Sequence, residues 1–268
     1  MCCMVRMAAL AVLAGAQIGH ASVTRGEPLN GEPTSAFPAI GEVGVRDGYD
    51  GCGTAVFGGQ YILTAAHLVT TNGQLYPASD VTFRLGGISY AVSSILSDFG
   101  ADLALLRLTS TSLDYVQLYT GQADRRGQVF TGVGYGQTDN DGNGSWGPGG
   151  NGVKRVFQNI VDDVLTSLIP GQGVVLRYDF DKTSGDSVGN TEGLHGPGDS
   201  GGGLFLWNGA EYQLAGVLSS SGDPINAVTG SAVDILPYAS LLSAAVPEPS
   251  GLAMLATGFI PLLRRRRN

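Results

Sequence analysis

Short apolar runs separated by turn residues dominate the middle of the chain. They are rich in valine, leucine, isoleucine, tyrosine and phenylalanine, and most are bounded by glycine, asparagine, aspartate or serine. Such runs predict β-strands, and many short strands at regular spacing favour a sandwich or a barrel. The predicted strands are 54–57, 61–66, 81–85, 103–108, 129–134, 174–178, 204–207 and 213–218.

Two other patterns complete this picture of the body. Gly58 and Gly59 separate the first two predicted strands and predict a tight hairpin turn. Residues 235–245 have the pattern of a helix. Residues 139–150 form a polar, glycine-rich stretch that partly resembles a calcium loop. The closing glutamate of such a loop is missing at the required spacing, which favours a surface loop.

Composition supports a β-rich fold with many turns. Glycine occurs 42 times in 268 residues, and charged residues are 14% of the chain against a typical ~25%. Helix interiors tolerate glycine poorly, whereas turns and bulges use it freely. Hydrophobic residues make up 43% of the chain, enough for a substantial core. The sequence therefore predicts an all-β protein with a short helix near its C-terminus.

The N-terminal segment, residues 1–21, has the features of a secretory signal peptide. Arg6 precedes an apolar run, and Gly19-His20-Ala21 places small residues where a signal peptidase reads them. The run is too short to span a membrane stably. A buried N-terminal helix is the alternative. The signal interpretation predicts export and cleavage by signal peptidase.

The C-terminal segment, residues 246–268, has three parts in a fixed order. A Pro-Glu-Pro stretch at 247–249 is followed by an apolar run at 251–263 and by four arginines at 264–267. Proline stiffens the first part, and the arginines would hold the end on the cytoplasmic side of a membrane. The order resembles the PEP-CTERM sorting signal of bacterial surface proteins, which implies an exosortase-type partner and transient membrane association. A plain membrane anchor or a disordered tail is the alternative.

Charge restricts the partners of the body between these ends, residues 22–245. The formal net charge is −8, and five of the fifteen basic residues lie in the end segments, so the body itself is more acidic. An acidic body is repelled by phosphate backbones, which excludes nucleic acid as an expected partner.

Cysteine and histidine are too scarce for a disulfide or a metal site in the body. Cys2 and Cys3 belong to the signal segment, so Cys52 would stand alone after processing. His67 and His195 are the only histidines after residue 20. We therefore expect no cofactor and no metal.

Three strings carry candidate chemistry. Thr-Ala-Ala-His at 64–67 ends a predicted strand, Asp102 begins the run Asp-Leu-Ala-Leu-Leu, and Gly-Asp-Ser-Gly-Gly at 198–202 precedes another strand. A serine hydroxyl needs a base to take its proton, and histidine suits that task near neutral pH. A carboxylate then fixes the tautomer of the imidazole and stabilises the imidazolium. The backbone N–H groups of Gly198 and Ser200 can point together at a developing oxyanion.

These strings resemble the three signatures of the trypsin-like serine peptidases, in the family's chain order of histidine, aspartate and serine. Residues 131–136 and 214–219 resemble the family's glycine-rich strand and its substrate-pairing strand, and 235–242 its C-terminal helix. The resemblance spans roughly residues 23–243. It implies two perpendicular antiparallel β-barrels with the active site between them. His67, Asp102 and Ser200 would form the catalytic triad, with Gly198 and Ser200 as the oxyanion hole; Asp98, a rival carboxylate, lacks the run that follows Asp102.

The chain departs from the family pattern at several positions. Leu68 replaces the cysteine that usually follows the histidine, so Cys52 is expected to be an unpaired buried thiol. Leu194 falls at the base of the implied specificity pocket, near Ser219, and cannot bind lysine or arginine. A small or apolar preference is expected instead.

Activation is a further expectation drawn from the resemblance. Val23 resembles the family's new N-terminus, whose amino group pairs with the aspartate before the nucleophile, here Asp199. Removal of the signal segment and of Ser22 would expose it.

The sequence thus favours a secreted endopeptidase that acts on protein or peptide substrates through an acyl-enzyme, at the surface or in the extracellular matrix of a bacterium. A catalytically silent barrel that serves as a surface or matrix binding module is the alternative of a different class. An esterase would use the same chemistry.

Overall fold

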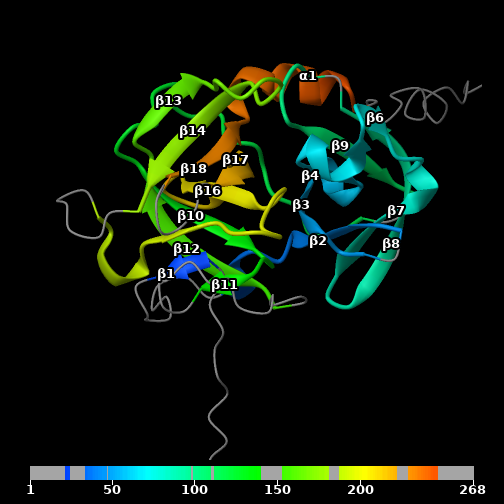
Figure 1. The fold of residues 1–268 in the computed structure, drawn as a ribbon, viewed down its shortest axis with the longest axis horizontal. Helices are drawn as coiled ribbons and strands as arrows, with labels where there is room; N and C mark the ends of the chain where they lie inside the picture. Colours follow the sequence, from blue (N-terminus) through cyan, green and yellow to red (C-terminus); the bar gives the residue numbers. More distant parts are fainter. Residues whose placement is uncertain are drawn as a thin grey trace, which may run out of the picture.

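The structure is a computed structural model that describes residues 22–24, 34–46, 48–97, 99–109, 112–139, 153–180, 187–221 and 229–246. Two β units lie side by side, with a short helix near the end of the described chain (Figure 1). The predicted all-β class is confirmed. The proposed signal peptide, the surface loop at 140–150 and the sorting signal from residue 247 onward lie outside the described residues.

The first unit is a closed barrel of six antiparallel strands. Apolar side chains fill it, among them Val43, Ile62, Phe83 and Leu106, all fully buried. Around the barrel the strands are β2 (Ile40–Val45), β3 (Gly51–Val56), β4 (Tyr61–Thr64), β9 (Ala104–Leu108), β8 (Ile88–Leu96) and β7 (Val81–Leu85).

The second unit is a curled sheet of seven antiparallel strands. Its core holds Phe130, Phe157, Tyr178 and Leu204. The arrangement fits the expected chymotrypsin-like fold, although strand pairing among the described residues closes only the first barrel. In sheet order the strands are β12 (Arg155–Ile160), β10 (Val129–Gly134), β16 (Gly203–Trp207), β17 (Tyr212–Ser221), β18 (Thr229–Asp234), β14 (Val174–Asp179) and β13 (Asp163–Thr166).

The remaining elements are short. A three-stranded sheet joins β11 (Thr138–Asp139), β1 (Ser22–Thr24) and β15 (Gly193–Leu194), and β5 (Thr70–Thr71) pairs with β6 (Gln74–Leu75). The 3-10 turns are η1 (Thr34–Ala36), η2 (Phe57–Gly59), η3 (Ala66–Val69), η4 (Ala78–Asp80), η5 (Gly189–Thr191) and η6 (Leu236–Tyr238). In the described part of the chain, no helix has the length and apolar character needed to cross a membrane.

A third apolar cluster joins the two units. Leu63 and Leu103 from the first unit meet Phe205 and Val217 from the second, and each is nearly or fully buried. Leu242 of α1 (Ala239–Ala244) completes this cluster. The interface between the units is therefore an apolar core that fixes their relative position.

Two sequence expectations can be compared directly with these elements. The Gly-Gly turn is confirmed, because Gly58 and Gly59 adopt φ values of 74° and 76° between β3 and β4. The helix predicted over 235–245 is shorter than expected. Its first turn is the 3-10 segment η6, and Pro237 lies at the start of that segment. Proline lacks the N–H group that a continuous helix would use.

Replacement of Leu242 by alanine should destabilise the whole body. The substitution opens a cavity in the core that joins the two units, which costs about 2–5 kcal/mol for a buried leucine. Leu241 is 53% exposed on the same helix, and Leu241→Ala should change the free energy of unfolding by less than about 0.5 kcal/mol. Urea unfolding of both variants measures the difference. Equal effects would contradict the anchoring role of Leu242.

Candidate active site

The pairing of β4 with β9 brings His67 and Asp102 together. Thr64 at the end of β4 pairs with Ala104 at the start of β9. The chain then continues from Thr64 into the turn η3, which carries His67, while Asp102 lies just before β9. Because antiparallel strands place these chain ends at one edge of the barrel, the two side chains face each other.

The Asp102 carboxylate accepts three hydrogen bonds. Its Oδ1 lies 2.8 Å from the His67 backbone nitrogen, and its Oδ2 lies 2.7 Å from His67 Nδ1 and 2.6 Å from the Ser219 hydroxyl. Burial alone would raise the pKa of Asp102, but the hydrogen bonds and the charge of His67 hold that pKa below its usual value. An ionised Asp102 orients the imidazole with Nε2 directed away from it, and the His67 side chain is 46% exposed.

Backbone contacts hold the Ser200 loop against the first barrel. The Cys52 N–H on β3 donates to the Ser200 carbonyl at 2.7 Å. Gly201 has a φ of 81°, and a Cβ there would collide with the Cys52 carbonyl and the Thr64 hydroxyl. Glycine is therefore required by both conformation and space. This contact brings the serine of the second unit to the histidine of the first.

The Ser200 hydroxyl donates to the Ser219 carbonyl at 3.4 Å, and the described structure has no hydrogen bond from it to His67. The Gly198 and Ser200 N–H groups have no acceptor among the described protein atoms. Catalytic hydrogen bonds are often loose before substrate binds. Two open donors beside a serine are the arrangement that an oxyanion hole needs.

Asp199 is buried beneath this loop. Its Oδ1 accepts from the Gly136 N–H at 2.7 Å and its Oδ2 from the Gly196 N–H at 2.9 Å. Burial raises the pKa of Asp199 to about 6, although these hydrogen bonds and the charge of Arg155 oppose the shift. The carboxylate thus lies in a site that favours its protonated form.

Gln172 is a residue that sequence reasoning missed. Its side-chain amide donates to Ser219 Oγ at 3.0 Å and to Ser220 Oγ at 2.7 Å. Its backbone carbonyl accepts from the Asp102 N–H at 3.4 Å. Gln172 therefore links the Asp102 side of the site to strand β17. No sequence motif predicts this role, because it depends on the contact between a loop of the second unit and Asp102 of the first unit.

Leu194 is a buried core residue, and its place at the base of a specificity pocket stays a prediction. It is 2% exposed and packs in the core of the second unit with Phe157 and Leu176. Its backbone on β15 pairs with Val23 on β1. Ser219, placed in the specificity pocket by sequence, lines a cavity beside His67 and binds Asp102.

His195 is a buried neutral imidazole. Burial lowers its pKa to about 3, and the nearby His67 charge acts in the same direction. Its Nδ1 lies 2.6 Å from the Tyr178 hydroxyl. This histidine packs with the core of the second unit.

Cys52 is a free, fully buried thiol, as predicted. Its Sγ lies 3.3 Å from the Gly198 carbonyl. Burial raises its pKa well above the usual value, so the thiol is neutral and unreactive.

A cavity of about 430 Å³ opens beside the imidazole. Both units contribute to it. Its lining comprises Ala66, His67, Thr70, Ala101, Asp102, Ile169, Pro170, Gly171, Gln172, Ser219 and Ser220.

Comparison with known proteins identifies the family. The sequence model of the family described as Trypsin matches residues 29–241. The chain belongs to the trypsin family. This family-wide match supports a peptidase that acts on proteins or peptides, in accord with the strings around His67, Asp102 and Ser200. No curated protein matches the chain.

Two solved structures share the trypsin-family fold. One is the inactive form of the Rv3671c protease, with a TM-score of 0.54 and 19% identity over 79% of this chain and 92% of that chain. The other is the apo MamO protease domain from Magnetospirillum magneticum, with a TM-score of 0.52 and 18% identity over 80% and 98%. At these identities the likeness concerns the fold.

The burial of Asp199 should appear in the pH dependence of stability. A carboxyl whose folded pKa is raised contributes stability at low pH, and that contribution is lost as pH rises through about 6. The unfolding free energy of the full chain should therefore fall by about 2 kcal/mol between pH 4 and 7, relative to Asp199→Asn. Urea unfolding at a series of pH values measures this. Parallel curves for the two proteins would contradict it.

Proposed function

We propose that the protein is an exported serine endopeptidase whose catalytic triad is His67, Asp102 and Ser200. The observation that carries the proposal is the Asp102 carboxylate, which binds both the backbone and Nδ1 of His67 at the edge of the site that holds Ser200. A buried carboxylate that fixes one imidazole nitrogen leaves the other free to act as a base.

The chemistry follows from these positions. Ser200 Oγ attacks the carbonyl carbon of the scissile peptide while His67 Nε2 takes its proton. The Gly198 and Ser200 N–H groups stabilise the oxyanion. His67 then gives the proton to the leaving amine, which leaves an acyl-enzyme on Ser200. In the second half of the reaction His67 activates a water molecule that attacks the acyl group, and the proton returns to Ser200 Oγ. The Ser200 side chain must rotate from the Ser219 carbonyl toward His67 before attack.

Activation by a new N-terminus at Val23 is part of the proposal. The backbone of β1 pairs Val23 with Leu194 and with Asp139, on segments that flank the Asp199 loop. An amino group beside Asp199 would hold its carboxyl ionised. Material that begins at Val23 should then keep its stability between pH 4 and 7, whereas the full chain loses stability over this range. N-terminal sequencing of secreted protein would identify the natural start.

Export and sorting complete the proposal. The segment at 1–21 would direct secretion, and the Pro-Glu-Pro, apolar and arginine parts of 246–268 would bring the protein to an exosortase-type enzyme. The peptidase body would then act outside the cell or on its surface.

A catalytically silent binding module is the second candidate. The observation that favours it is the hydrogen bond of Ser200 Oγ, which goes to the Ser219 carbonyl rather than to His67. A silent module would keep this arrangement in every state.

A fluorophosphonate probe separates the two candidates. The purified protein, with its Val23 start verified, should be labelled at Ser200, because an activated serine attacks the probe. Ser200→Ala should abolish labelling, and His67→Ala should slow it by a factor on the order of a thousand or more. Casein against a simple ester as substrate then distinguishes a peptidase from an esterase. No labelling of correctly folded and processed protein would favour the silent module.

Gln172 should tune the His67 base through Ser219 and Asp102. Gln172→Glu adds a negative charge near the triad and favours the imidazolium, so the acid limb of the kcat/KM profile should move to higher pH. Gln172→Ala should lower kcat about three- to tenfold. Leu168→Ala, at a residue 98% exposed in the same loop, is the control. An unshifted acid limb in Gln172→Glu would show that Gln172 only shapes the loop.

A further inference from the structure

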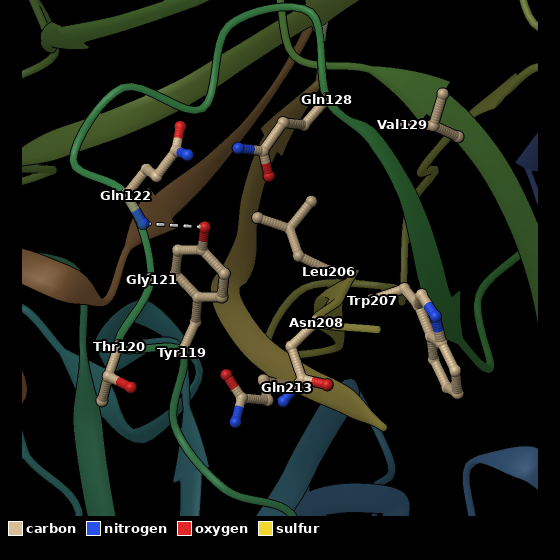
Figure 2. Close-up of a pocket in the computed structure, with 10 residues that line it drawn as sticks. All are labelled: Tyr119, Thr120, Gly121, Gln122, Gln128, Val129, Leu206, Trp207, Asn208 and Gln213. Carbon is tan, nitrogen blue, oxygen red and sulfur yellow. Dashed lines mark hydrogen bonds between the residues drawn. The ribbon is translucent and has the colours of Figure 1, made fainter. Parts of the chain in front are cut away.

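A row of aromatic side chains runs from the core between the units to the surface. Strand register places Phe205, Trp207 and Tyr212 on one face of the β16–β17 hairpin, because Trp207 pairs with Tyr212 and Phe205 lies two residues earlier on the same strand. Figure 2 shows the other face of β16, where the Trp207 indole points away from Leu206. The ring of Phe37 lies 4.9 Å from the ring of Phe205 and from that of Tyr212. The Trp207 ring lies 5.0 Å from Tyr212, so the row ends at solvent.

A groove of about 550 Å³ lies along this aromatic row. Three segments form its walls. Pro38 comes from the segment before β2, Tyr115 and Gln117 come from the segment that links the two units, and Trp207 and Glu211 come from the β16–β17 hairpin. Both units therefore contribute to the groove. It shares no lining residue with the cavity beside the proposed catalytic histidine, so it is a separate site.

Hydrogen bonds hold these walls in place. In the linking segment, the Val116 N–H donates to a carbonyl of β3 at 3.0 Å, and the Gln117 carbonyl accepts an N–H of β17 at 2.9 Å. In the hairpin turn, Asn208 Oδ1 accepts the Glu211 N–H at 2.9 Å. The linking segment is thus tied to both units, and the turn that carries Glu211 is braced from within. A surface fixed in this way loses little entropy when a ligand binds.

Two of the aromatic residues combine exposed rings with open hydrogen-bond donors. Trp207 is 56% exposed and Tyr115 is 48% exposed. Neither the indole N–H nor the Tyr115 hydroxyl has a hydrogen-bond partner among the described residues. A proline-rich chain has the complementary chemistry, because its carbonyl groups form no internal hydrogen bonds and its prolines have no N–H. Its flat rings also pack well on aromatic faces.

Charge narrows the choice of proline-rich partner. Glu211 is exposed, is the one charged residue that lines the groove, and pairs with no cation in the described part of the chain. A basic side chain is therefore the electrostatic complement. The proline-rich stretches of this chain itself carry Glu27, Glu32 and Glu248, which Glu211 would repel. These charges favour a basic segment from another protein.

We propose that this groove binds a proline-rich segment of another protein, in the polyproline II conformation and with a basic residue among its prolines. Proline rings would pack on Trp207 and Tyr115, and backbone carbonyls would accept from the indole N–H and the tyrosine hydroxyl. An arginine or lysine would pair with Glu211. The partner would leave Ser200 open, because the groove and the cavity beside His67 are separate. The proposal does not depend on peptidase activity.

Binding of labelled peptides tests the proposal. The full chain with Ser200→Ala, which removes any proteolysis, is titrated into a fluorescein-labelled nonapeptide that has arginine at its centre and proline elsewhere. Fluorescence anisotropy should show saturable binding. One comparator is the proline peptide with glutamate at its centre, and the other is a glycine–serine nonapeptide with a central arginine. Each comparator should bind at least about tenfold more weakly, because it lacks either the charge or the preformed conformation.

Variants then locate the site. Trp207→Ala should weaken binding of the arginine peptide about tenfold, and Glu211→Lys should make the glutamate peptide the tighter ligand of the two. Gln128→Ala, in the cavity that Figure 2 shows, should bind as the parent does. Urea unfolding verifies that each variant is folded. The proposal is overturned if no proline peptide binds, if a comparator binds the parent as tightly, if Trp207→Ala binds unchanged, or if Glu211→Lys still prefers arginine.

Discussion

The contact between the Ser200 loop and strand β3 is the constraint on which the site depends. It is made by backbone atoms, through the Cys52 N–H and the Ser200 carbonyl, with glycine at 201 so that the chains can approach. A side chain at this point would push the serine away from the histidine by more than a hydrogen bond tolerates. Because Ser200 lies on one unit and His67 on the other, their relative position depends on this backbone contact.

The apolar core between the units supplies that rigidity. The resemblance to trypsin-like peptidases implies a disulfide next to the histidine. In this chain, however, Cys52 is a free thiol and Leu68 follows His67. Buried leucines, phenylalanines and valines from both units fill the interface instead. Dense packing of this kind resists small displacements as well as separation. The hydrogen bonds of Gln172 and Ser219 then orient the Asp102 carboxylate, because hydrogen bonds depend on angle and apolar contacts do not.

The sequence predicted the parts of the site that depend on local strings. His67 and Asp102 meet because each lies a few residues beyond a paired strand end, and the apolar runs of β4 and β9 can be read directly. The strand β12 was missed because its buried positions include Arg155 and Asn159 beside Phe157, which masks the alternation.

Other features depend on contacts between distant segments. Gln172 acts through a loop that crosses from one unit to the other, which no local pattern encodes. Leu194 was expected in a pocket because the alignment counted back from Ser200 through a glycine-rich stretch. The structure packs its side chain in the core of the second unit, while its backbone on β15 pairs with β1.

Asp199 shows why the environment of one carboxyl can govern such a site. Two backbone N–H groups and the charge of Arg155 are too little to offset its burial, so the ionised form is costly. That cost falls on the same loop that positions Ser200 and the open N–H groups of Gly198 and Ser200. Any positive group that reached Asp199 would stabilise the ionised carboxylate and, with it, one conformation of the loop. A change in the ionisation of this buried acid would therefore act directly on the loop that carries Ser200.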